Sequence, residues 1–464
     1  MKTSDAFKLI VQIESSVDTD VFIWKGFNTW PLIRQILWVE LTSTASNDKT
    51  SKKGSTLEIF ASIKKIVLAI YYSFSEAKIS QDNTKIFISR PVYLQELHSE
   101  KYFDRIVDPI IELFGLNEKI TKFYVSNVPN KKELMYEFLV MHQSFSFNIL
   151  TLDSEQKKVF QQITRLSSVS NLELQRRYKQ KLRSFIRWFV AAKKILSKQK
   201  KLKEIYLTSW YFPDMMGICA AASELGIKTI DVQHGKQGKY QAMYSGWTKI
   251  PESGYTIMPD NFWCWGRTSC NHILASSPNR KSNIPFIGGY PWIDYYKKNL
   301  IPVGSKIIDN EIRVLVTMQS PQGENKERIP SFIVEFLLSK QMTDFHFTFR
   351  LHPNDADGHH YCNERLRSID ANLYNIDSGK SNLYDTFMSS THHITAYSSC
   401  CYEANIFGVP TLLFGAEAKD IYGDDIRSGI FQWTNGKMLD MSVWLNSPNN
   451  LSQSDYIEAT YLND

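Results

Sequence analysis

The sequence predicts an α/β protein built from two Rossmann-like domains. The chain has 464 residues, and a chain of this length suits two domains of roughly 200 residues better than one core. Short runs rich in Ile, Val, Tyr and Phe alternate with segments of helical periodicity, which is typical of parallel sheets covered by helices. The alternation occurs in two series, so we predict one domain over residues 1–298 and a second over 299–464.

The first series follows a helical N-terminal extension. Residues 1–80 are predicted to be mostly helical, with helices at 24–41 and 57–74. The predicted strands are 85–89, 122–125, 204–208, 228–232, 262–265 and 285–287. A helix over 213–225, which Gly226 ends, lies between the third and fourth of these strands. A strand, a helix and a second strand in this order form a unit of a parallel sheet.

The second series begins after residues 288–310, which we interpret as an interdomain linker. Its predicted strands are 313–317, 346–351, 393–396 and 411–414, and its predicted helices are 331–339, 383–389 and 400–407. This order again predicts a doubly wound parallel sheet. Only weak helices are expected after residue 430.

Composition excludes several classes of protein. The formal net charge is only +6, so a nucleic-acid partner is not expected. The six cysteines form no CxxC pair, and no His cluster has zinc-ligand spacing, which favours free thiols in a reducing compartment. The N-terminus lacks a signal-peptide pattern and no window reaches about 18 apolar residues. A cytoplasmic location is therefore expected.

One segment, 176–203, is both amphipathic and strongly basic. Such a helix can lie on an anionic membrane surface, so one interpretation is a peripheral contact with the inner face of the cytoplasmic membrane. The other interpretation is a domain helix whose apolar stripe faces the core and whose lysines face solvent. Amphipathicity alone does not separate the two.

Candidate site residues follow the strands, because open parallel sheets bind ligands beyond the carboxyl ends of their strands. Gln233, His234 and Gly235 directly follow the predicted strand 228–232. A neutral His can accept a proton from a sugar hydroxyl near pH 7, so His234 is a candidate catalytic base. Asp231 is a second catalytic candidate, although a carboxylate inside a strand is usually satisfied locally. Gly235 is expected to allow a tight turn or a close approach to a ligand.

Two exits of the second series are candidate phosphate sites. Arg350, His352 and Pro353 stand at the first, where Pro353 favours an extended backbone at His352. Ser398 and Ser399 stand at the second, at the start of a helix, where free N–H groups favour an anion. The alternatives are an ordinary turn at the first exit and a simple N-cap at the second.

Weaker signals lie nearby. Glu403, inside the helix that follows Ser399, is expected to hold ribose hydroxyls, and Gln319 and Ser320 are possible phosphate or sugar contacts. Residues 355–357 match an Asp-x-Asp metal motif, but we interpret them as a polar turn, so no metal is expected. The GxxxxGK[ST], GxGxxG and GxSxG patterns are absent, which argues against P-loop kinases, dinucleotide oxidoreductases and α/β-hydrolases.

These landmarks together resemble bacterial GT-B transferases of surface polysaccharides. The residues concerned are Gln233-His234-Gly235, Gly289-Tyr290-Pro291 with Asp294, Arg350 to Pro353, Ser398-Ser399 with Glu403-Ala404, and Gly408-Val409-Pro410. The resemblance covers about 204–430 and concerns two groups. One is the CMP-sugar transferases, including Kdo transferases and sialyltransferases, and the other is the CDP-glycerol glycerophosphotransferases.

The resemblance implies a GT-B-like fold whose two domains face a central cleft. It implies transfer of a Kdo- or sialic-acid-like sugar from a cytidine nucleotide to a capsule or lipopolysaccharide glycan, with no cofactor beyond the nucleotide-sugar co-substrate. His352 and the Ser398/Ser399 pair would hold the donor phosphate. Some family members place an acidic residue where His234 stands, which leaves the catalytic group and the stereochemistry open. The alternatives are a glycerophosphotransferase, a nucleotide-sugar 2-epimerase and a non-catalytic scaffold at a membrane surface.

Overall fold

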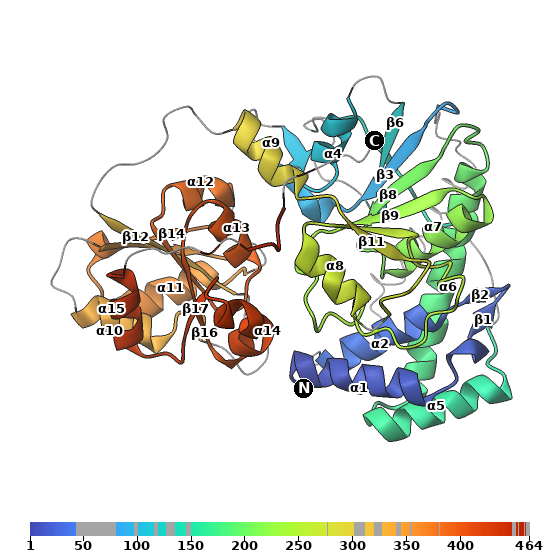
Figure 1. Cartoon of the computed structure of the whole chain (residues 1–464), viewed down its shortest axis with the longest axis horizontal. Coiled ribbons are helices and arrows are strands. Elements are labelled where there is room, and N and C mark those ends of the chain that lie inside the picture. The colour runs from blue at the N-terminus through green and yellow to red at the C-terminus, as the bar shows by residue number, and fades with distance from the viewer. Residues whose placement is uncertain are drawn as a thin grey trace, which may run out of the picture. The chain divides into compact units, whose positions relative to one another are not determined.

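The chain forms two compact units, seen in a computed structural model (Figure 1). The structure describes residues 1–42, 80–96, 101–115, 119–126, 134, 136–144, 150–275, 277–300, 311–319, 327–339, 345–352, 355–379, 381–447, 452, 454–458 and 460. Unit 1 comprises Met1–Tyr295 and the tail from Glu458, and unit 2 comprises Tyr296–Ile457. The boundary expected between residues 298 and 299 lies close to this division, but the tail belongs to unit 1. The helix expected at 57–74, Ser320 and Pro353 lie outside the described residues.

Unit 1 contains a parallel sheet of seven strands in the order β11-β10-β9-β8-β3-β6-β7. The strands are β3 (Lys85–Ser89), β6 (Ile120–Tyr124), β7 (Leu139–Val140), β8 (Glu204–Thr208), β9 (Lys228–Val232), β10 (Asn261–Cys264) and β11 (Ile284–Ile287). The chain runs outward from β3 to β7, returns to β8 and continues to β11. The strand order therefore reverses between β3 and β8.

Unit 2 contains a parallel sheet of six strands in the order β14-β13-β12-β15-β16-β17. The strands are β12 (Ile312–Thr317), β13 (Phe345–Arg350), β14 (Tyr374–Asp377), β15 (His392–Thr395), β16 (Thr411–Phe414) and β17 (Gln432–Thr434). The order reverses between β12 and β15. Together the two sheets confirm the predicted α/β class with two Rossmann-like domains.

Helices connect the strands in both units. Unit 1 contains α1 (Thr3–Ser16), α2 (Trp30–Thr42), α4 (Asp108–Phe114), α5 (Ser154–Ser167), α6 (Asn171–Leu196), α7 (Pro213–Glu224) and α8 (Arg267–Leu274), and α9 (Pro291–Asn299) spans the division between the units. Unit 2 contains α10 (Ser331–Ser339), α11 (Gly358–Leu366), α12 (Leu383–Met388), α13 (Cys400–Ile406), α14 (Ala416–Arg427) and α15 (Met438–Leu445). None of the described helices has an apolar stretch long enough to cross a bilayer.

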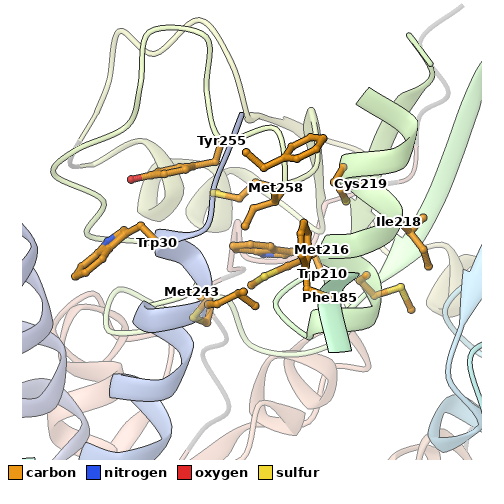
Figure 2. Packing of buried hydrophobic residues seen from close by; sticks show 14 of the residues in the cluster. Trp30, Phe185, Trp210, Met216, Ile218, Cys219, Met243, Tyr255 and Met258 are labelled. Carbon is orange, nitrogen blue, oxygen red and sulfur yellow. The ribbon is translucent and has the colours of Figure 1, made fainter. Parts of the chain in front are cut away.

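The core of unit 1 is built around α6 and α7, which run close together (Figure 1). Gly217 makes this possible, because a Cβ there would lie 2.7 Å from the Phe185 carbonyl oxygen and 2.7 Å from the Phe189 nitrogen. Figure 2 shows Phe185, Met216 and Trp210 packed in this core. The apolar stripe of α6 is thus buried inside unit 1, which agrees with the domain-helix interpretation of 176–203, and its polar face is left outside.

The N-terminal helices are joined to the loop after β9 by a buried ion pair. Glu14 and Arg34 are fully buried, and their side chains lie 2.6 Å apart. Arg34 also donates to the carbonyl oxygens of Ala242 and Ser245 at 2.7 and 2.8 Å, while Glu14 accepts the Thr248 backbone N–H at 2.9 Å. Buried charges need such complete pairing. The extension therefore holds in place the loop that begins at His234.

Three sequence predictions are corrected. The helix expected at 24–41 begins at Trp30, because β1 (Ile23–Trp24) and β2 (Phe27–Asn28) form a hairpin over Lys25 and Gly26, both of which have positive φ. The expected linker 288–310 contains α9. Beyond residue 430 the structure has β17, a sixth strand of the sheet, as well as α15.

Candidate functional site

Each unit has one position where its strand order reverses. In open parallel sheets the loops there diverge to opposite faces and leave a crevice at the carboxyl ends of the strands. In unit 1 this crevice lies beyond β3 and β8, and in unit 2 it lies beyond β12 and β15. Polar side chains gather at both positions, and each is described within its own unit.

His234 lies in a network of hydroxyl groups at the unit 1 reversal. Its Nε2 atom lies 3.2 Å from the Ser209 hydroxyl and 3.3 Å from the Tyr211 hydroxyl, and the Tyr93 hydroxyl lies 2.7 Å from Ser209 Oγ. The Nδ1 atom faces the Val232 carbonyl oxygen at 3.4 Å. A carbonyl can only accept, so Nδ1 carries the proton and Nε2 is left as the acceptor. This tautomer suits a base that receives a proton from a hydroxyl.

The electrostatics keep His234 neutral. Burial of the ring lowers the pKa of His234 to about 4, and the nearby positive charges of Arg90 and Arg105 act in the same direction. The hydrogen bond to Val232 opposes this shift but does not cancel it. At pH 7 the imidazole is therefore uncharged and able to accept a proton.

The sequence analysis missed the other members of this cluster. Ser209 has a φ of 59°, an uncommon conformation for a non-glycine residue and one often found at functional sites. Ser89 and Thr208, which end β3 and β8, are buried, and their hydroxyl groups have no hydrogen-bond partner among the described residues. Their position at strand exits was the available signal, but only the strand order shows that β3 and β8 are neighbours.

Asp231 lies beneath the cluster rather than in it. The side chain is fully buried, and its two carboxylate oxygens accept from the Trp210 backbone N–H at 3.1 Å and the Tyr244 hydroxyl at 2.9 Å. Burial raises the pKa of Asp231 to about 8. Both oxygens are occupied, so the geometry assigns Asp231 to holding the β8 and β9 exits together instead of to proton transfer.

The residues beside His234 are also structural. Gln233 is buried, donates to the Gly235 carbonyl oxygen at 2.9 Å and accepts the Trp265 backbone N–H at 2.7 Å. Gly235 does not have a positive φ, and a Cβ there would meet open space. The backbone at Gly235 therefore does not require glycine for a left-handed turn, and its approach to a ligand stays a prediction.

The unit 2 reversal holds a small pocket of about 20 Å³. Its described lining residues are Thr317, Gln319, Glu327, Arg328, Ala396, Tyr397 and Phe414. Gln319 was predicted to contact the donor, and the structure places it here at the exit of β12. A space of this size holds roughly one water molecule, so a larger ligand requires the lining side chains to move apart.

Arg328 is the cation among the described lining residues of this pocket, beside the carboxylate of Glu327, which pairs with Arg365, and it was missed from the sequence. Its side chain is 9% exposed and lies 3.3 Å from Asp355 and 3.8 Å from Asp357, and its guanidinium stacks 4.7 Å from the centre of the Tyr361 ring. The Nε and Nη1 groups have no hydrogen-bond partner within the described part of the chain. Because Nε still faces Asp355, Nη1 is the unused donor, and a nearly buried guanidinium with such a donor is suited to an anion such as phosphate.

The Asp-x-Asp match at 355–357 is explained by this contact, because both carboxylates face Arg328. Within the described residues no group of His, Cys, Asp and Glu side chains has the arrangement of a metal site. All six cysteines are free thiols.

Arg350 is buried and fully engaged at the end of β13. Its guanidinium donates to the Asp377 carboxylate, to the Ser381 hydroxyl at 2.7 Å and to the Thr386 hydroxyl at 3.2 Å. It also contacts the carbonyl oxygens of Gly379 and Ser381. Arg350 therefore fixes the loop between β14 and α12 through both of its terminal amino groups. His352 follows directly, and partial burial lowers its pKa.

Ser398 and Ser399 follow β15, next to Tyr397 of the pocket. The Ser398 hydroxyl contacts the Cys400 thiol and accepts the Cys400 backbone N–H at 3.3 Å, whereas Ser399 makes no side-chain cap. Glu403 is 8% exposed and accepts a hydrogen bond from Tyr384 at 2.6 Å. Ser398 thus lies next to a lining residue of the pocket. The side chain of Glu403, within α13, is instead hydrogen-bonded to Tyr384 of α12.

A buried histidine fixes the strands that carry this pocket. His393 Nε2 lies 2.9 Å from the Thr317 hydroxyl and Nδ1 lies 3.0 Å from the Thr411 hydroxyl, so the ring joins β12, β15 and β16. Burial lowers the pKa of His393 to about 3, which keeps the ring neutral. His393 therefore positions Thr317 at the edge of the pocket.

Comparison with known proteins gives similarity of structure alone. No protein-family model and no curated protein matches the sequence. The solved UDP-GlcNAc 2-epimerase from Methanocaldococcus jannaschii is similar with a TM-score of 0.48, 14% identity, and coverage of 81% of this chain and 96% of that chain. A UDP-glucosyltransferase from Polygonum tinctorium gives a TM-score of 0.46, 8% identity, and coverage of 80% and 91%.

A UDP-GlcNAc 2-epimerase from Neisseria meningitidis bound to UDP-GlcNAc gives a TM-score of 0.45, 14% identity, and coverage of 81% and 96%. These similarities are too remote to assign an activity to this chain.

Proposed function

We propose that this chain is a sugar-nucleotide enzyme in which unit 2 binds the nucleotide phosphates and unit 1 supplies a neutral histidine for proton transfer. The observation that carries the proposal is Arg328, a nearly buried guanidinium whose Nη1 donor is unused, beside the crevice where the strand order reverses. Such a crevice is the usual place for a nucleotide in this class of sheet. Gln319 and Tyr397 also line this pocket.

Glycosyl transfer is the reaction that uses these groups most directly. The acceptor hydroxyl gives its proton to His234 Nε2, and its oxygen forms the new bond to the anomeric carbon. The bond from that carbon to the phosphate oxygen breaks, and the leaving nucleotide keeps the electron pair. Arg328 stabilises the charge that develops on this phosphate.

A nucleotide-sugar 2-epimerase is the second candidate. It would bind its substrate through the same Arg328 pocket, and a neutral His234 also suits proton transfer at a sugar ring. No described side chain distinguishes cytosine from uracil, so the cytidine donor, the Kdo- or sialic-acid-like sugar and the glycerophosphotransferase alternative are not carried forward. The remaining alternative, a non-catalytic scaffold at a membrane surface, requires no nucleotide and therefore predicts that none binds.

Calorimetric titration with UDP, CDP and CMP tests the nucleotide site. We expect at least one to bind, and no binding by any of the three would contradict the proposal. Incubation with UDP-GlcNAc in the absence of an acceptor, followed by proton NMR, then separates the reactions. Appearance of the 2-epimer identifies an epimerase, whereas unchanged substrate that is consumed only when a glycan acceptor is added identifies a transferase.

A further inference from the structure

A second cavity lies in unit 1, outside the strand-exit cluster of His234. It has a volume of about 490 Å³, within the range of small-molecule sites. Its lining residues are Arg176, Arg177, Gln180, Lys181, Ser184 and Pro213. The first five lie at helical spacing along one face of α6, and Pro213 is the first residue of α7.

The lining is cationic, and its charges are only partly balanced. Arg176 and Arg177 share one carboxylate, Glu173, at 2.6 and 2.7 Å, and Arg177 also pairs with Glu40 at 2.6 Å. Lys181 has no ion pair among the described residues, and burial together with the charge of Arg177 lowers its pKa. No described carboxylate lines the cavity. A bound anion would relieve this repulsion.

The cavity adjoins the His234 cluster through α7. Pro213 lies between Phe212, whose ring is 4.4 Å from the Arg90 guanidinium, and Asp214, whose carboxylate is 2.5 Å from it. Arg90 in turn acts electrostatically on His234. Arg90 therefore links the start of α7, which borders the cavity, with the proposed base.

We propose that this cavity, named the α6 cavity, binds a phosphate ester carried by the acceptor. Binding of an anion in the α6 cavity does not depend on the nucleotide site. Only the assignment of the phosphate to an acceptor rests on the proposed function. Arg176, Arg177 and Lys181 supply donors for the phosphate oxygens, and Gln180 and Ser184 supply neutral ones. A soluble sugar phosphate and a lipid headgroup present the same chemistry.

The test compares two double variants with equal loss of charge. Arg176→Gln/Lys181→Gln alters the α6 cavity, whereas Arg183→Gln/Lys200→Gln removes two exposed cations that do not line it. Arg328→Gln serves as a third protein in which only the unit 2 pocket changes. Thermal denaturation of all three confirms that each is folded. Glucose 1-phosphate is titrated by calorimetry, and sedimentation with phosphatidylglycerol vesicles is compared with sedimentation with phosphatidylcholine vesicles.

We expect the wild type to bind glucose 1-phosphate or phosphatidylglycerol vesicles, and the cavity variant to bind at least tenfold more weakly. The surface variant should bind as the wild type does, whereas any loss of binding in Arg328→Gln would measure the share of the probe held by the unit 2 pocket. Which probe binds identifies the source of the phosphate. Equal binding by the cavity variant and the wild type, or no binding of either probe by the wild type, would overturn the proposal. Loss of nucleotide binding alone would instead count against the proposed function.

Discussion

His234 Nε2 and Ser209 Oγ lie 3.2 Å apart, although 25 positions separate them in the chain. Ser209 follows β8 and His234 follows β9, and these neighbouring strands bring the two side chains to one edge of the sheet. Because Nδ1 of His234 faces a carbonyl oxygen, the ring accepts from Ser209 through Nε2. A substrate hydroxyl that replaces Ser209 as donor would meet the same lone pair.

Replacing His234 tests this lone pair. We expect His234→Gln to lower turnover by about 100-fold or more, as loss of a general base does, with nucleotide affinity unchanged because Arg328 lies in the other unit. Ser209→Ala, which removes the competing donor but keeps the base, should reduce turnover much less. Steady-state kinetics measures both, and equal losses would show that the cluster acts only through structure.

The pH profile tests the charge state of the same ring. An ordinary His has a pKa near 6.5, whereas burial lowers the pKa of His234 to about 4. The neutral base therefore persists as pH falls from 7 to 5, and activity should be lost only as pH approaches 4. We expect His234→Gln to lack this acid limb in kcat/KM. An acid limb near pH 6.5 in the wild type would argue against a buried neutral base.

Asp231→Asn separates a structural carboxyl from a catalytic one. The folded-state pKa of Asp231 is raised to about 8, so the folded protein binds a proton that the unfolded chain releases near pH 4. This stabilisation is fully present below about pH 4 and is lost as pH rises towards 8. Asparagine can accept from the Trp210 N–H through its oxygen and donate to the Tyr244 hydroxyl through its NH2 group, so we expect unchanged turnover and a flatter dependence of melting temperature on pH. A large loss of turnover without a change in stability would make Asp231 catalytic.

Arg328→Gln tests the unit 2 pocket. Hydrogen bonds to a charged group contribute about 1.5–3 kcal/mol, so nucleotide affinity should fall by at least tenfold. Arg365→Gln is a matched control, because Arg365 pairs with the neighbouring Glu327 but does not line the pocket. Calorimetry compares the two. Equal affinities for wild type and Arg328→Gln would place the phosphate elsewhere.

Gly217→Ala tests the contact between α6 and α7. A Cβ at this position would lie 2.7 Å from two backbone atoms of α6, and such overpacking typically costs about 1–3 kcal/mol. Gly423 is a control within α14, where the nearest atom to a Cβ is the flexible end of Arg427 at 3.4 Å, so Gly423→Ala should not destabilise. Urea denaturation followed by circular dichroism measures both.

Much of the fold could be predicted from the sequence. Strands Lys85–Ser89, Glu204–Thr208 and Lys228–Val232 have the predicted bounds, because buried parallel strands are continuous apolar runs bounded by polar residues. Short elements such as β7 and β17, with two and three residues, carry too little pattern to detect. The β1–β2 hairpin was missed because the helical periodicity of the following segment extends back over Trp24.

Individual site residues were harder to predict. Placing residues at strand exits directed attention to His234 and Gln319, but could not show that Arg350 is bonded to the distant loop between β14 and α12. Arg328 was missed because it follows no strand, and it reaches the pocket only through the packing of Tyr361 and Asp355. Buried contacts of this kind depend on residues far away in the chain.

The sequence by itself determined the α/β class, the two series of strands and the strand exits at which polar residues stand. These features depend on local periodicity and on where each apolar run ends, and both can be read from consecutive residues. Only the tertiary structure decided which exits are neighbours and which polar groups remain available. Strand order brings Ser209 to His234, the packing of the segment before α10 brings Arg328 to Gln319, and burial fixes His234 as a neutral acceptor. Both follow from long-range packing, which no single segment of the chain contains.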